Sequence, residues 1–125
     1  MATVTHALNL APTPDIGSGT IGHTVTWETL TSSNADGEGF RLGGEILDAN
    51  VQIFGTFDGA TVQVQGSNDD GTTWAQLRDL SGALIAITAA DIVELLERPD
   101  KIRILTSGGG GSQDIDVVAM IRVSY

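Results

Sequence analysis

The stretch from residue 50 to residue 77 constrains the fold more than any other part of the chain. Two strand-like segments, residues 50–57 and 60–65, meet at Asp58-Gly59. This dipeptide accepts the left-handed backbone of a two-residue hairpin turn. The stretch therefore predicts a β-hairpin within an antiparallel meander.

The alternation of apolar and polar residues within the hairpin predicts that one face of the sheet is exposed to solvent. Val62 and Val64 alternate with glutamines, as a half-buried strand requires. A second turn signal at residues 67–71 leads into another short strand at residues 74–77. None of these residues carries evident chemistry.

Further strands are predicted on both sides of this region. The clearest is the last segment, where alternate residues from Ile115 to Tyr125 are apolar. Val118 and Met120 fall on its other face, which indicates that the middle of that face is covered too. The remaining strands are expected at residues 20–30, 84–87 and 101–106.

One helix is expected at residues 88–98. Thr88 and Asp91 resemble a capping box, an apolar stripe follows from Ile92 to Leu96, and Pro99 stops the pattern. With this helix as a crossover, the fold class is all-β: an antiparallel β-sandwich or barrel of about seven or eight strands.

Composition narrows the function. A chain of 125 residues without cysteine is expected to form one domain without disulfides or thiolate chemistry. The net charge of −10 argues against nucleic acid and anionic membranes as partners. The chain lacks the basic and apolar blocks of an export signal, so synthesis in a cytoplasm is expected.

Short motifs favour structural interpretations. Gly17, Gly19 and Gly22 match the dinucleotide pattern G-x-G-x-x-G, but a proline-rich arm precedes them and a strand follows, which favours a linker. Residues 68–71 resemble part of a calcium loop, yet a solvated hairpin tip is favoured. His23 is interpreted as a partly exposed packing residue. We expect no enzyme activity, no cofactor, no metal and no small-molecule substrate.

Irregular segments supply the candidate contact sites. Residues 1–19 are expected to form an extended arm before a domain at residues 20–125, because Pro12 and Pro14 oppose regular pairing. Residues 31–45 are expected to form a long loop. The candidate interface residues from these regions are Thr3, Thr5, His6, Leu8, Leu10, Pro12, Pro14, Phe40, Arg41 and Leu42. Trp27 is added to them because it lies shortly before the loop at residues 31–45.

The two tryptophans receive different interpretations. A sheet protein with six aromatic residues is expected to use its largest ones as core anchors. Trp74 is therefore assigned to the core. For Trp27, core and interface remain equally open.

The segments at residues 55–77 and 97–123 resemble a family of small structural proteins of tailed bacteriophages. Their shared pattern is G-T-F-x-G-A-T-V-x-[IV]-Q-G-S-N-D-G-x-x-W, a short helix, E-x-P-x-x-I-R, a glycine-rich turn and a final strand. The resemblance covers roughly three-fifths of the chain, and the extra acid Asp70 departs from it. The matching positions are Gly55, Thr56, Phe57, Gly59, Ala60, Thr61, Val62, Val64, Gln65, Gly66, Ser67, Asn68, Asp69, Gly71, Trp74, Glu97, Pro99, Ile102 and Arg103.

The resemblance implies a capsid decoration, or cement, protein. Such a protein binds the major capsid protein on the outer surface of the virion, commonly as a homotrimer. An arm could then add a strand to a neighbour or wrap it. The rival resemblance is to discoidin-type modules, whose S-N-D-G-x-x-W turn lies near a carbohydrate or lipid surface; it implies a fibre or tail module that binds sugars.

Overall fold

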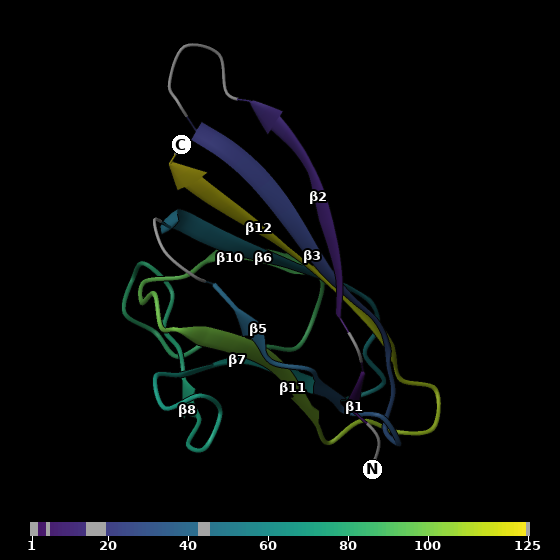
Figure 1. Ribbon diagram of the computed structural model, residues 1–125. Helices are drawn as coiled ribbons and strands as arrows, with labels where there is room; N and C mark the ends of the chain where they lie inside the picture. Colours follow the sequence, from purple (N-terminus) through teal and green to yellow (C-terminus); the bar gives the residue numbers. More distant parts are fainter. Residues whose placement is uncertain (1–2, 5, 15–19, 43–45, 125) are drawn as a thin grey trace.

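The computed structural model describes residues 3–4, 6–14, 20–42 and 46–124, with side chains described for residues 23–42 and 48–122. Two sheets pack face to face, as Figure 1 shows, so the expected all-β sandwich is confirmed. Seven strands span four residues or more, and five others span two residues each. Within the described ranges there is no helix, and so none that is long and apolar enough to cross a membrane.

The five-stranded sheet contains the long strands and runs in the order β10-β6-β12-β3-β2. All its pairings are antiparallel. Its strands are β2 (His6–Pro14), β3 (Thr20–Leu30), β6 (Ile46–Thr56), β10 (Asp91–Glu94) and β12 (Asp114–Ser124). In Figure 1 the ends of β2, β3 and β12 extend beyond the other sheet.

The seven-stranded sheet runs β1-β4-β11-β7-β8, with β5 paired to β11 and β9 paired to β7. Only the β1–β4 pairing is parallel among those described. Its strands are β1 (Thr3–Val4), β4 (Asp36–Gly37), β5 (Phe40–Arg41), β7 (Thr61–Ser67), β8 (Ala75–Gln76), β9 (Ala86–Ile87) and β11 (Lys101–Ser107).

The core lies between the sheets and follows the period of two. On β12 the buried residues are Ile115, Val117, Ala119 and Ile121, as the sequence predicted. Val62 and Val64 of β7 face them from the other sheet, while the intervening glutamines are partly exposed. Alternation in both sheets thus creates one shared apolar layer.

The predicted hairpin at Asp58-Gly59 is wrong, although its turn is correct. Both residues have positive φ, at 48° and 83°, and Ala60 N donates to Phe57 O at 2.9 Å. However, β6 pairs with β10 and β12, whereas β7 pairs with β11, β8 and β9, so the turn joins two sheets. Strand length explains this: β6 and β12 each span 11 residues, and β7 and β11 each span 7. The fold is consequently a sandwich with crossovers and not a meander.

The predicted helix at residues 88–98 is also wrong, because this segment forms the edge strand β10. Residues Asp91 to Glu94 pair with β6, with Ile92 exposed, and Leu95 directly after the strand is buried. A helix of two or three turns is marginal by itself. Pairing with the edge of β6 satisfies the backbone of this segment and places Leu95 in the core.

A buried polar network ties the two sheets together near the beginning of β12. Gln113 Nε2 donates to Leu30 O at 3.1 Å and to Thr106 Oγ1 at 2.9 Å, and Thr106 Oγ1 donates to Ala35 O at 2.9 Å. Thr106 and Gln113 are each about 3% exposed. These bonds connect β3, β11 and the loop after β3 in one water-excluded cluster.

Candidate functional site

The loop between β7 and β8 is held by its own side chains. Ser67 Oγ donates to Asp69 Oδ1 at 2.7 Å and accepts from Gly71 N at 3.0 Å. Asp69 Oδ1 also accepts from Thr73 N at 2.8 Å. The Ser67 hydroxyl and then the Thr73 amide lower the pKa of Asp69 from 3.8 to about 2.

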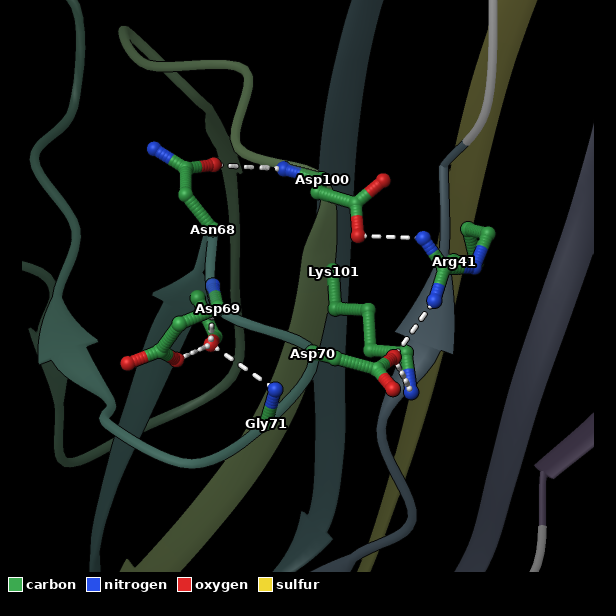
Figure 2. A network of polar contacts seen from close by, with 8 residues as sticks. Arg41, Asn68, Asp69, Asp70, Gly71, Asp100 and Lys101 are labelled. Atoms are coloured by element: carbon green, nitrogen blue, oxygen red, sulfur yellow. Dashed lines mark hydrogen bonds and ion pairs between the residues drawn. The ribbon is translucent and has the colours of Figure 1, made fainter.

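A network of ions connects this loop to β5 and β11, as Figure 2 shows. The Asp70 carboxylate lies 3.0 Å from Lys101 Nζ and also pairs with Arg41. Arg41 pairs in addition with Asp100, whose backbone N donates to Asn68 Oδ1 at 2.8 Å. The hydrogen bond from Lys101, followed by its charge, lowers the pKa of Asp70.

The network satisfies the charges of the loop from within the chain. Asp69 and Asp70 are engaged by hydroxyl, amide and cationic partners. In the part of the chain with described side chains, no three His, Asp or Glu residues lie together as metal ligands would. The arrangement stiffens a loop tip and presents paired charges that are partly exposed.

The structure decides which of the two tryptophans belongs to the core. Trp27 is fully buried, and its Nε1 donates to Glu38 O at 2.8 Å. Trp74 is only partly buried, so its assignment to the core is wrong. The Arg103 guanidinium lies 4.5 Å from the Trp74 ring centroid, which places the indole on the outer face of the seven-stranded sheet.

An open groove of about 530 Å³ lies beside the loop. Its walls combine the polar residues of the loop with apolar side chains of Leu77 and Pro99. The full lining is Gly66, Ser67, Asn68, Asp69, Thr73, Ala75, Leu77, Glu97, Arg98 and Pro99. None of these lining residues is aromatic.

The structure places the candidate residues of the N-terminal arm on both sheets. Thr3 belongs to β1 and pairs with Asp36, while Thr5 lies outside the described residues. His6 and Leu8 belong to β2 and pair in register with Trp27 and Val25.

Leu10, Pro12 and Pro14 continue β2. The register of β2 shifts between Asn9 and Thr13, so proline interrupts the pairing without ending the strand. Residues 6–14 of the arm thus form an edge of the five-stranded sheet.

The other candidate residues, in the segment at residues 31–45, lie mainly against the body of the domain. Leu42 is about 9% exposed and belongs to the core, and Phe40 packs against it. Arg41 is the exposed member and belongs to the ion network. Residues 43–45 lie outside the described residues.

The histidines occupy neighbouring strands. His6 lies in β2, and His23 lies in β3 opposite Ile121 of β12. His23 is partly buried, as expected, and its Nδ1 is buried without a hydrogen-bond partner among the described residues. A lone imidazole in this setting indicates packing.

Sequence reasoning missed one group of exposed apolar side chains near β10, called here the apolar band. The band consists of Phe54, Leu80, Leu84, Ile92 and Leu96, which are 38%, 56%, 52%, 59% and 43% exposed. Ile92 had been assigned to the buried stripe of a helix. Residues 92, 93, 95 and 96 are all apolar, so the sequence carried no alternation that could have revealed which of them are exposed.

Strand pairing relates several members of the band to one another. Leu84 pairs with Arg78, whose carbonyl accepts from Leu96 N at 2.9 Å. Ile92 lies on the same side of its strand as Leu96 and opposite Gln52, two residues from Phe54. Leu80 lies in the turn after Arg78. Apolar side chains that gather in this way commonly mark a contact surface.

The chain matches no model of a known protein family, and a search of curated proteins finds no significant relative.

Proposed function

We propose that this protein is a bacteriophage head decoration protein. It binds the outer capsid surface of the virion, stabilises contacts between capsomers of the major capsid protein, and acts as a homotrimer. The proposal combines the motif resemblance with a scaffold whose loop charges are paired internally. It makes the protein a structural component and not an enzyme.

The observation that carries the proposal is the position of β2. This strand pairs with β3 alone among the described elements, so its outer edge offers backbone donors and acceptors to another protein. Strand addition at such an edge needs no pocket and no catalytic group. A cement protein requires contacts of this type, repeated over many copies.

Binding to heads tests the proposal. Purified protein is added to heads of the phage that encodes the chain, prepared without it, and occupancy is counted by cryo-electron microscopy. We expect decoration at capsomer junctions and heads that release DNA at a higher temperature. Absence of binding to expanded heads would refute the proposal.

A variant that lacks residues 2–14 tests the role of the arm. We expect lower head occupancy from this variant, because β2 and its open edge are removed. Circular dichroism of the isolated variant is the control for the sandwich. Unchanged occupancy would refute the contribution of the arm.

The groove beside the β7–β8 loop supports one alternative, a discoidin-like module that binds carbohydrate. Its polar loop residues and the apolar Leu77 and Pro99 form a surface on which a sugar could lie. Binding to a glycan array without affinity for heads would favour this alternative. Aromatic residues are absent from the lining, so we rank it second.

A further inference from the structure

The outer face of the seven-stranded sheet carries an arginine that is held in place by its neighbours. Arg103 of β11 lies opposite Gln65 of β7 and between two buried isoleucines, so its side chain projects from the outer face. Arg103 Nε donates to Gln65 Oε1 at 2.8 Å, and Gln65 Nε2 donates to Gln63 Oε1 at 3.3 Å. The Gln65 amide is thereby fixed at both of its ends, and it fixes one edge of the guanidinium.

Trp74 holds the guanidinium from a second direction. The central carbon of the Arg103 guanidinium lies 4.5 Å from the centroid of the indole ring. The indole is itself confined, because a Cβ at Gly39 would lie 2.9 Å from Trp74 Cη2 and a Cβ at Gly71 would lie 3.3 Å from Trp74 Cζ2. Arg103 is therefore ordered before a partner arrives, which lowers the entropy that a partner must remove on binding.

Arg103 is a cation without a carboxylate. Among the described side chains it takes part in no ion pair, whereas ion pairs are formed by Arg41, Arg78, Lys101 and Arg122. The two terminal nitrogens of the Arg103 guanidinium donate to no acceptor among the described residues. The chain has 16 acidic and 6 basic residues, so an unpaired guanidinium is not explained by a shortage of carboxylates.

The surroundings of Arg103 favour a carboxylate ligand. The network in Figure 2 sets two cations against two anions, which are Arg41, Lys101, Asp70 and Asp100. Arg103 lies on the same strand as Lys101 and adds a positive charge that this network does not balance. A carboxylate has two oxygens that match two parallel donors of a guanidinium.

We propose that Arg103, held by Trp74 and Gln65, binds a carboxylate side chain of a partner protein. The site takes one Asp or Glu side chain through the two terminal nitrogens of the guanidinium. A protein fits this site better than an acidic sugar, because the guanidinium covers one face of the indole on which a sugar ring would otherwise stack. Arginine and tryptophan are also the residues that most often dominate the energetics of protein–protein contacts.

The inference rests on the proposed function only for the identity of the partner, which would be the major capsid protein. Arg103 lies on the seven-stranded sheet, whereas β2 lies at the edge of the five-stranded sheet. The carboxylate contact is thus separate from strand addition at β2, and a substitution of Arg103 leaves the arm unchanged.

A peptide probe tests the site without heads. The purified full chain is titrated with a blocked tetraglutamate peptide, and binding is followed by the NMR resonances of the Arg103 Nε–H group and the Trp74 indole N–H. We expect saturable binding with a dissociation constant on the order of 1 mM, and no binding of the matched tetraglutamine peptide. Resonances that do not move at about 10 mM tetraglutamate would overturn the inference.

Two variants of Arg103 separate its charge from its geometry. Arg103→Gln should weaken tetraglutamate binding at least about tenfold, because a charge-assisted hydrogen bond is lost. Arg103→Lys keeps a cation over Trp74 but lacks the pair of parallel donors, so it should weaken binding about threefold to tenfold. Circular dichroism verifies that each variant is folded.

The matched control is Arg98→Gln. Arg98 is an exposed arginine whose Nη1 donates only to Leu96 O, at 3.4 Å, among the described residues. Its removal changes the net charge by the same amount as Arg103→Gln and should change tetraglutamate binding less than about twofold. Equal effects of Arg103→Gln and Arg98→Gln would overturn the inference.

Head binding separates the inference from the proposed function. Arg103→Gln should decorate heads at lower occupancy than Arg98→Gln at the same protein concentration. Full decoration by Arg103→Gln supports the function and refutes the inference. A natural chain that binds tetraglutamate but leaves heads bare supports the carboxylate site and refutes the function. Tighter binding of an oligogalacturonate than of tetraglutamate would overturn the inference in favour of an acidic sugar.

Discussion

The buried network of Gln113 and Thr106 should couple the stabilities of the two sheets. Gln113→Met keeps a side chain of similar length but removes the donor to Leu30 O and Thr106 Oγ1. Thr106→Val keeps the shape of the side chain, and Ala35 O still accepts from Thr106 N at 2.9 Å. The two changes therefore leave different numbers of buried groups unpaired.

The expected losses in the free energy of unfolding follow from the hydrogen bonds that each change removes. Gln113→Met loses two hydrogen bonds and leaves Leu30 O without this donor, so we expect a cost of about 2–3 kcal/mol. Thr106→Val leaves one N–H of Gln113 without its acceptor but leaves no carbonyl unpaired, so we expect about 1–2 kcal/mol. The double variant should cost about 1 kcal/mol less than the sum, because one hydrogen bond is counted in both single variants.

Urea unfolding, followed by tryptophan fluorescence and circular dichroism, measures these free energies. Gln113→Met should lower the melting temperature by several degrees, at roughly 3–5 °C per kcal/mol for a domain of this size. Additive single effects would refute the coupling between the two side chains. A stability of Gln113→Met within about 0.5 kcal/mol of the natural chain would refute the reasoning altogether.

Three further predictions concern single residues. The pKa of Asp69 falls from 3.8 to about 2 on folding, so its contribution to stability is present above about pH 4 and is lost as the pH falls toward 2. The stability of Asp69→Asn, measured by urea unfolding, should therefore depend less on pH in this range than the stability of the natural chain. An equal dependence on pH would contradict this prediction. Gly66→Ala should destabilise the protein by about 1–3 kcal/mol in thermal melts, because a Cβ at this position would lie 2.5 Å from Pro99 Cγ. Gly111→Ala is the control and should be neutral, because a Cβ there would have nothing within 4 Å. Equal melting temperatures for these two variants would be the contrary result. Trp27→Phe, which loses a buried donor and leaves a void, should cost about 2–4 kcal/mol by urea unfolding, and a cost below about 0.5 kcal/mol would count against this.

Local signals predicted the components of the fold. Alternation in β12 and β7 identified the inward-facing residues, because the period of a strand depends on the backbone alone. Asp58-Gly59 identified a turn with two left-handed residues, because few dipeptides tolerate that backbone. The choice of interface residues was less successful, since Trp27 and Leu42 are buried in the structure.

Local sequence patterns did not reveal which strands pair with each other. The turn at Asp58-Gly59 is compatible with a hairpin or a connection between sheets, and the match of strand lengths decided between them. The helical capping pattern at residues 88–98 did not prevail, because a helix of this length is marginal by itself and the edge of β6 accepts the segment as a strand. The apolar band followed from that change, because it placed Ile92 outside.

By itself, the sequence determined an all-β, cysteine-free and acidic domain, its buried alternating residues and most of its turns. Those properties depend on side chains and neighbouring backbone. Tertiary structure alone decided which strands share a sheet, which tryptophan is buried, and which edges stay open. Such outcomes depend on competition between distant segments for the same hydrogen bonds and the same core.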